Sequence, residues 1–397
     1  MSQAVSRDPT VRNVVLLAIC QGLAMSTSAL TISVASLVGY SLAVDKSLAT
    51  MPLFFQFAAV MVVTIPASLF MKRFGRRAGL SLGAAVGMVS GLLSAWAIFE
   101  SSFTLFCVGA FLFGISVAHA FYYRFAAADT ASATFKSKAI ALVLAGGLVA
   151  AFLGPELAKW SKDLFAPVLF AGGYLAISVL LLASLVILQF IRIPRTLESM
   201  ARGGRPLLEI VRQPRFIIAV LCATTGYGAM NLVMTATPLA VIACNHPFES
   251  AAFVIQWHVV AMFAPSFFTG HLIQRFGVAP LLIVGTLLIL GCVAVNLSGV
   301  EVAQFWAALV LLGLGWNFLF VGATALLTET YRPAEKAKVQ GLNDFLVFGT
   351  VALTALTSGA LFDTLGWEAV NLAVVVPVLA AGAAALWLGR QHHPAAA

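Results

Sequence analysis

SLFMKRFGRR, residues 68–77, returns in the second half of the chain as GHLIQRFG, residues 270–277. Arg73-Phe74-Gly75 and Arg275-Phe276-Gly277 lie 202 residues apart, and the same offset carries Cys20 onto Cys222. Each copy closes a long apolar run and precedes another. The chain is therefore built from two halves that repeat one architecture.

The composition requires that architecture to lie in lipid. Hydrophobic residues make up 61% of the 397 residues, charged residues only 10%, and the mean hydropathy is +1.00. A soluble domain carries about 25% charged residues to face water. The chain lacks the polar side chains that a soluble surface of this size needs.

Apolar runs long enough to cross a bilayer recur along the whole sequence. A spanning helix needs about 20 consecutive, mostly apolar residues. Twelve such runs are predicted, at 14–42, 48–71, 79–99, 103–127, 138–156, 167–191, 216–243, 251–273, 279–298, 303–328, 339–361 and 370–389. The sequence predicts an all-α, multi-pass membrane protein of twelve transmembrane helices.

The positive charges orient these helices. With the N-terminus inside, all of the 23 lysines and arginines fall on the cytoplasmic side except Lys46, Lys159 and Lys162. Lysine and arginine are retained on the cytoplasmic side of membrane proteins. Both termini are thus expected in the cytoplasm of a bacterial cell with the chain in its inner membrane. The net charge of +8 reflects this topology and not a nucleic-acid surface.

The longest polar stretch lies midway and divides the chain. We expect an N-terminal six-helix bundle at 1–191, a cytoplasmic linker at 192–215 and a C-terminal six-helix bundle at 216–397. Two repeated halves of six helices are the architecture of secondary transporters. The two bundles are therefore expected to be pseudo-symmetric.

With these features the chain resembles the major facilitator superfamily, whose loop between spans two and three reads G-x-x-x-D-(R/K)-x-G-(R/K)-(R/K). Residues 68–77 follow this pattern except at two positions: Ser68 stands at the first glycine, and Lys72 replaces the carboxylate. The resemblance implies a cytoplasmic gate at this loop, with Lys72 and Arg73 on one side. We expect Asp344, near the start of the eleventh span, to offset Lys72; Arg124 is the alternative partner of that carboxylate.

Polar or sulfur-bearing side chains inside spans are the candidates for function, because lipid offers them no partner. Span seven carries Met230 and Met234, and span eight carries His258 and Met262. Residues at i and i+4 share one helix face. Three thioethers and one imidazole are ligands that suit Cu(I) and not magnesium or calcium. They predict a metal site in the C-terminal half.

The alternative interpretation of these residues is packing, since methionine often fills gaps in a core. For this composition, roughly 0.25 MxxxM pairs and roughly 0.15 HxxxM pairs are expected by chance. Paired MxxxM and HxxxM motifs on spans seven and eight resemble the bacterial CcoA-like copper importers, which supply copper for cytochrome oxidase biogenesis. That resemblance implies copper as cargo at Met230, Met234, His258 and Met262.

The five cysteines contain no CxxC and form no disulfide framework. Cys222 and Cys244, at the two ends of span seven, match cysteines of the copper importers. The functional interpretation is a metal relay; the alternative is that both are small apolar fillers.

These observations predict an alternating-access copper importer that is not an enzyme, needs no cofactor and works as a monomer. Its expected partners are the copper ion as substrate, the lipid bilayer, and a cytoplasmic copper chaperone or thiol reductant. The alternative is a carrier of an organic solute such as a riboflavin-like vitamin; a membrane-embedded sensor without transport is a third interpretation. Side chains that would suit the vitamin are Tyr122, Tyr123, Tyr227, Asn231 and Asn317.

Overall fold

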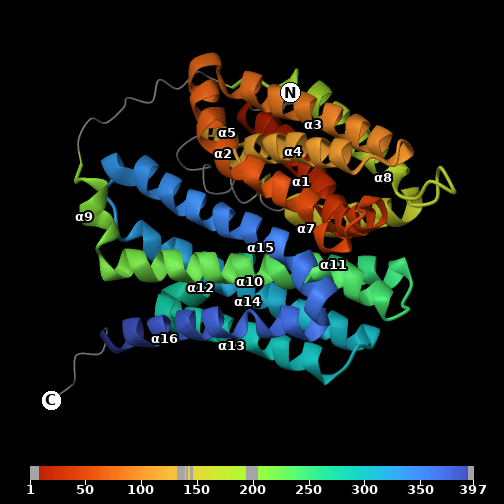
Figure 1. Cartoon of the computed structure of the whole chain (residues 1–397). Coiled ribbons are helices and arrows are strands. Elements are labelled where there is room, and N and C mark those ends of the chain that lie inside the picture. Colours follow the sequence, from red (N-terminus) through yellow and green to blue (C-terminus); the bar gives the residue numbers. More distant parts are fainter. Residues whose placement is uncertain (1–8, 132–138, 140–141, 144–145, 194–203, 392–397) are drawn as a thin grey trace, which may run out of the picture. The chain divides into compact units, whose positions relative to one another are not determined.

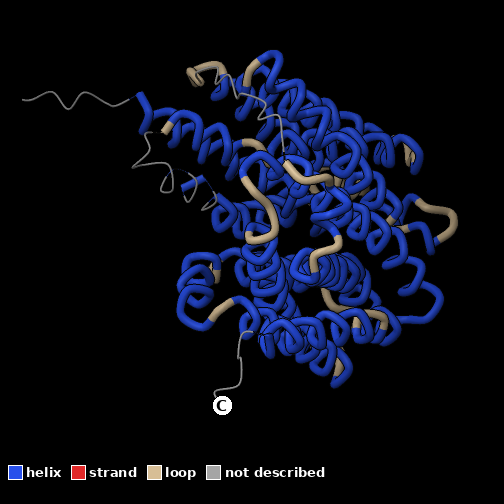
Figure 2. The backbone as a smooth tube through the Cα atoms, turned by 90° about the vertical axis from the view of Figure 1, so that its left-hand side faces the viewer, coloured by secondary structure: helices blue, strands red, loops and turns tan. Residues whose placement is uncertain are grey.

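The computed structural model describes residues 9–131, 139, 142–143, 146–193 and 204–391. Throughout these residues the chain is helical, with short turns and no strand (Figures 1 and 2). In hydrocarbon the backbone N–H and C=O groups find partners only within the protein, and an α-helix satisfies them within one segment. The predicted all-α class is confirmed.

The helices follow one another along the chain with short connections. In order they are α1 (Pro9–Leu42), η1 (Lys46–Leu48), α2 (Met51–Phe74), α3 (Arg76–Phe99), α4 (Phe103–Ala120), α5 (Tyr123–Thr130), α7 (Gly146–Ser161), α8 (Ala171–Leu188), α9 (Leu207–Val211), α10 (Pro214–Ala243), α11 (Phe248–Phe263), α12 (Ser266–Phe276), α13 (Val278–Ser298), α14 (Val302–Thr328), η2 (Pro333–Glu335), α15 (Lys336–Leu372) and α16 (Val375–Gln391).

These helices account for the predicted spans. Within the described residues, nine helical stretches are long and apolar enough to cross a membrane, and α11 with α12 makes a tenth that bends by 42°. The longest stretch, 336–391, contains two predicted spans, because the backbone leaves the helical conformation at Gly366 (φ +81°). The fifth predicted span, 138–156, lies partly outside the described residues and continues as α7.

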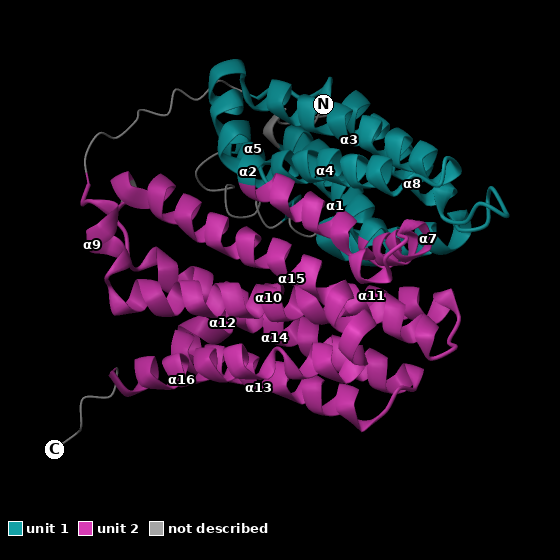
Figure 3. Cartoon of the chain, in the orientation of Figure 1, with its two compact units in different colours: residues 1–31, 62–199 teal, residues 32–61, 200–397 magenta. Residues whose placement is uncertain are grey.

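The described chain forms two compact units (Figure 3). Unit 1 comprises residues 1–31 and 62–199, and unit 2 comprises residues 32–61 and 200–397. Helices α1 and α2 each contribute to both units. The boundaries predicted at 191 and 215 follow the sequence repeat instead, and they stay a prediction.

Small residues bring the helices of unit 1 close together. In α3, Gly83, Gly87 and Gly91 lie four residues apart and face α4 and α8. A Cβ atom at Gly83 would lie 2.4 Å from the Cβ of His119. Because lipid is as apolar as a side chain, membrane helices associate through such close packing and through hydrogen bonds between helices.

Hydrogen bonds between helices hold unit 2. Asn231 of α10 donates to the Val351 carbonyl of α15 (3.0 Å), and Ser358 of α15 donates to the Leu232 carbonyl of α10 (2.7 Å). These two bonds run in opposite directions across the same helix pair. They fix the register of α15 against α10.

The sequence repeat is reproduced in the local structure. Gly75 (φ 94°, ψ 155°) and Gly277 (φ 87°, ψ 170°) each end one helix and cap the next. This backbone conformation is essentially restricted to glycine. In both copies, the arginine two residues before the glycine lies over the ring of the phenylalanine between them. The distances from guanidinium carbon to ring centroid are 5.2 and 5.3 Å.

Within unit 2, an ion pair connects the residues just before α9 to the turn before α15. Glu335 is fully buried and accepts hydrogen bonds from the Arg205 guanidinium at 3.0 and 2.8 Å and from its backbone N–H at 2.7 Å. The Arg332 backbone N–H donates at 2.9 Å. The hydrogen bonds from Arg205 and Arg332 hold the pKa of Glu335 well below its usual value.

We predict that Gly277→Ala destabilises the protein whereas Gly270→Ala does not. An alanine at 277 must adopt a glycine-only conformation, which costs about 1–3 kcal/mol. Gly270 is helical with no atom within 4 Å of an added Cβ, and alanine is favoured over glycine in a helix by about 0.5–1 kcal/mol. Thermal unfolding of the purified variants measures the difference; equal melting temperatures would contradict it.

We also predict that Glu335→Gln lowers the melting temperature at pH 7 by several degrees. Because the pKa of Glu335 is depressed in the folded state, its stabilisation is present above the ordinary pKa and is lost as pH falls through the folded pKa. The variant therefore loses less stability than the wild type on acidification. Glu209→Gln is the control, since Glu209 is 57% exposed and lies 3.9 Å from the same arginine.

Candidate functional site

The four predicted metal ligands are all buried in unit 2. Met230 and Met234 in α10 are 1% and 3% exposed, and His258 and Met262 in α11 are 0% and 7% exposed. Burial of all four side chains agrees both with a metal site and with a packed hydrophobic core. Their convergence on one metal ion stays a prediction.

The contacts of α11 show what His258 and Met262 do in the fold. The Nδ1 atom of His258 lies 2.8 Å from the Leu309 carbonyl of α14, and Asn317 of α14 donates to the Met262 carbonyl at 2.7 Å. Gly313 leaves room for this approach, because a Cβ there would lie 2.6 Å from the His258 carbonyl. The Nε2 atom of His258 is buried and has no partner among the described residues.

The two proposed relay cysteines differ in environment. Cys222 is fully buried, with its Sγ 3.9 Å from the Ala381 carbonyl of α16. Its repeat counterpart Cys20 is equally buried, with its Sγ 3.7 Å from the Ser184 carbonyl of α8. The matching contacts favour packing as the role of both. Cys244 is partly exposed at the end of α10, and burial together with Glu301 raises its pKa; the relay stays a prediction.

The predicted gate residues are divided between the units. Lys72, Arg73 and Arg124 are exposed residues of unit 1, whereas Asp344 is a half-buried residue of unit 2 that accepts a hydrogen bond from Asn343 at 3.2 Å. Pairing of Asp344 with Lys72 or Arg124 therefore stays a prediction.

Unit 1 contains an ion pair at this loop that the sequence reasoning missed. Arg76 Nε lies 2.9 Å from Asp129 Oδ2, with the two side chains only 19% and 15% exposed. The Arg76 guanidinium also lies over the Tyr122 ring, 5.7 Å from its centroid. Asp129 follows the fourth predicted span on the cytoplasmic side, so the topology alone could have suggested it as the partner of an arginine. Asp129 thus supplies a carboxylate to this loop, whose own carboxylate position is occupied by Lys72.

The most distinctive cluster of unit 2 is aromatic. Tyr227 of α10 makes edge contacts with Trp316 (5.3 Å), Phe320 (5.3 Å) and Phe348 (5.9 Å). Trp316 and Phe320 of α14 are stacked at 5.2 Å with an interplanar angle of 11°. Tyr227, Phe320 and Phe348 are only half-buried, so the cluster presents ring surface beyond the core of unit 2.

Unpartnered polar atoms occur on the same helices as this aromatic cluster. Tyr227, Asn231 and Thr235 follow one another at i+4 along one face of α10. Asn231 Oδ1, Thr235 Oγ1 and Trp316 Nε1 are buried without a hydrogen-bond partner among the described residues. A buried polar group left unpaired costs about 1–3 kcal/mol. Such groups are free to bond an incoming ligand.

The other side chains expected to suit a vitamin have structural partners. Asn317 contacts Thr269, Ser266 and the Met262 carbonyl at 2.7–2.8 Å. In unit 1, the Tyr122 hydroxyl donates to the Thr64 carbonyl at 2.8 Å, and Tyr123 lies in the buried core. Of the five predicted residues, Tyr227 and Asn231 remain as candidate ligand contacts.

Comparison with known proteins fixes the family. The family model described as Major Facilitator Superfamily matches residues 17–342 and 247–397. The chain belongs to the major facilitator superfamily. It is not an enzyme but a multi-pass membrane transporter. The predicted all-α major facilitator fold is confirmed, and the crystal structure of a D-xylose–proton symporter shares it with a TM-score of 0.75, 18% identity and coverage of 94% and 97% of the two chains.

The sequence relatives overturn the predicted cargo. The riboflavin transporter RfnT of Brucella anthropi is 44% identical over 93% of both chains. The uncharacterised transporter YdeG of Bacillus subtilis is 31% identical over 73% of this chain and 70% of that one. The prediction of copper import for cytochrome oxidase biogenesis is therefore wrong, because the relative that matches nearly the whole chain is named for a vitamin. The likeness to CcoA-like importers rests on motif residues that the core packing also explains.

We predict that Asp129→Asn destabilises this member of the superfamily by about 1.5–3 kcal/mol, the range for a hydrogen bond between charged groups. Asp163→Asn is the control, because Asp163 is 63% exposed and lies 3.8 Å from Lys162; such exposed pairs contribute at most about 1 kcal/mol. A double variant Arg76→Gln/Asp129→Asn should cost less than the sum of the single variants. Strict additivity in thermal unfolding would show that the pair is not coupled.

Proposed function

We propose that the chain carries riboflavin, or a vitamin with a similar flat heteroaromatic ring, across the bacterial cytoplasmic membrane. The observation that carries this proposal is the aromatic cluster around Tyr227 and Trp316. The 44% identity to a riboflavin transporter over nearly the whole chain supports the same cargo.

The chemistry of the cluster suits such a ring. Aromatic pairs stabilise one another by about 0.5–1.5 kcal/mol beyond the area that they bury, in offset-stacked or edge-to-face geometry. A flat vitamin can therefore extend the stack that Trp316 and Phe320 begin. Small-molecule sites combine apolar and aromatic walls with a few polar groups that fix orientation. Trp316 Nε1 is a donor and Asn231 Oδ1 an acceptor for the polar edge of the ring.

Transport follows the scheme of repeated-half carriers, in which one half rocks against the other. We assign the moving halves to the bundles at 1–191 and 216–397, joined by the linker at 192–215. The charge distribution supports placing both termini in the cytoplasm. The carrier works as a monomer and requires no copper chaperone.

The direct test is uptake of radiolabelled riboflavin by cells that cannot synthesise the vitamin, with and without this protein, and with copper uptake measured in parallel. We expect riboflavin uptake to depend on the protein and copper uptake to be unchanged. A protein-independent riboflavin signal would reject the proposal.

Variants of the aromatic cluster sharpen the test. We predict that Trp316→Phe, which keeps a stacking ring but removes the N–H donor, raises the KM for riboflavin about five-fold, the effect of one neutral hydrogen bond of about 1 kcal/mol. Trp316→Leu also removes the stacking ring and should reduce uptake further. Trp306→Leu is the control, since Trp306 is 38% exposed and outside the cluster. Equal KM values in Trp316→Phe and wild type would remove Trp316 Nε1 from the site.

A further inference from the structure

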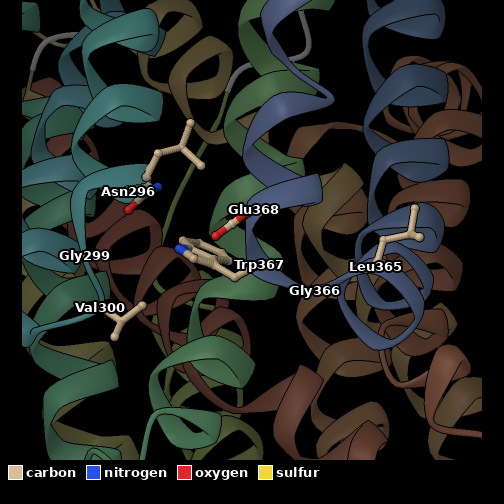
Figure 4. A pocket seen from close by; sticks show the side chains of 8 residues that line it. Asn296, Gly299, Val300, Leu365, Gly366, Trp367 and Glu368 are labelled. Carbon is tan, nitrogen blue, oxygen red and sulfur yellow. The ribbon is translucent and has the colours of Figure 1, made fainter.

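A cavity of about 360 Å³ lies at one end of unit 2, away from the aromatic cluster. It is open on one side and bounded by the turn between α13 and α14 and by the bend at Gly366, at the end of unit 2 opposite to α9 (Figure 1). Its lining residues are Asn296, Leu297, Gly299, Val300, Leu365, Gly366, Trp367 and Glu368 (Figure 4). A water molecule takes about 30 Å³ of liquid volume, so this space exceeds that of a few waters.

Two buried polar atoms at this cavity lack partners. Asn296 is 3% exposed, and its Oδ1 has no hydrogen-bond partner among the described residues, although its Nδ2 donates to Asn371 at 2.7 Å. The indole Nε1 of Trp367 is likewise buried and unpaired within the described chain. Figure 4 shows this nitrogen turned to the side of the cavity on which Asn296 lies. The described protein thus leaves one acceptor and one donor unpaired at this cavity.

Glu368 adds a negative charge to this pair. Its carboxylate lies beside the Trp367 ring in Figure 4 and has no ion-pair partner among the residues that the structure describes. A carboxylate and an unpaired amide oxygen at one cavity favour a ligand with several N–H donors and a positive charge, which is the chemistry of a primary ammonium. The indole N–H favours an oxygen acceptor on the same ligand.

The walls of the cavity are held in place by their own contacts. The His246 ring nitrogen Nε2 lies 2.8 Å from the Val300 carbonyl, and the Trp367 ring packs on Phe305 with centroids 5.5 Å apart. Asn371 donates to the Trp367 carbonyl at 2.9 Å. These contacts fix the position of Trp367 and of the turn at Val300.

Apolar side chains surround the opening. Leu297, Val300 and Leu365 are 42%, 45% and 68% exposed. In a transmembrane protein, exposed apolar side chains at the end of the spans meet the boundary between acyl chains and head groups. An ammonium and an oxyanion joined to acyl chains satisfy both the polar groups and this apolar rim.

We propose that this cavity binds the head group of a phospholipid that ends in a primary ammonium. The ammonium donates to Asn296 Oδ1 and Glu368, and a phosphate oxygen accepts from Trp367 Nε1. Binding here couples the lipid to the bend at Gly366 within α15. A quaternary ammonium has no N–H and cannot make these bonds.

The test compares lipids retained by the purified protein in native mass spectrometry, with phosphatidylethanolamine and phosphatidylcholine offered in equal amounts. We expect preferential retention of phosphatidylethanolamine, lowered about ten-fold by Glu368→Gln and by Trp367→Phe, as for loss of one charge-assisted hydrogen bond. Trp367→Phe keeps a ring against Phe305, so a folded variant is expected. Asp363→Asn is the control, because Asp363 is an exposed carboxylate of the same helix outside the cavity lining.

Three results would overturn the proposal: equal retention of the two lipids, unchanged selectivity in both cavity variants, or equal loss in Asp363→Asn. A separate arm adds soluble O-phosphorylethanolamine to delipidated protein and follows the melting temperature. Stabilisation as large as that given by the lipid would show that the site takes a free solute and would reject the lipid assignment. None of these measurements depends on riboflavin transport.

Discussion

Lipid offers no hydrogen-bond partner, and this constraint governs every level of the structure. The described backbone is helical because a helix satisfies its own N–H and C=O groups. Polar side chains inside the spans bond to carbonyls of neighbouring helices, as Asn231 does with Val351 and Ser178 with Met88. The Arg205–Glu335 pair lies outside the long apolar helices, between the residues before α9 and the turn before α15. A buried polar atom without a hydrogen-bond partner therefore requires an explanation.

The features that follow from composition and periodicity could be predicted from the sequence. The repeat of Arg73-Phe74-Gly75 at Arg275-Phe276-Gly277 has a structural counterpart in two glycines of nearly equal backbone conformation. The ion pairs could not be predicted in the same way. Arg205 and Glu335 are 130 residues apart, and the sequence pattern does not specify which carboxylate an arginine meets. The bend between α11 and α12, next to Pro265, and the break in α15 at Gly366 likewise do not follow from hydropathy.

The copper hypothesis failed because one pattern has two physical origins. Methionine and histidine at i and i+4 share a helix face whether that face binds a metal or packs against another helix. Here His258 contacts the Leu309 carbonyl, and Gly313 opens the space for α11 to approach α14. Spacing alone does not distinguish these roles. Identity over nearly the whole chain does, since it compares every position and not four.

Unpaired polar atoms are more specific evidence than residue type. Leaving a buried donor or acceptor unsatisfied costs about 1–3 kcal/mol, and a packed apolar side chain would avoid that cost. Trp316 Nε1 lies in the aromatic cluster, and Trp367 Nε1 lines the end cavity. A ligand can form a hydrogen bond with such an atom only in the conformation that orients the atom toward the ligand. Binding therefore shifts the population of the protein toward that conformation. For the proposed vitamin and the proposed lipid, such a bond is therefore a means of selecting one conformation of the carrier.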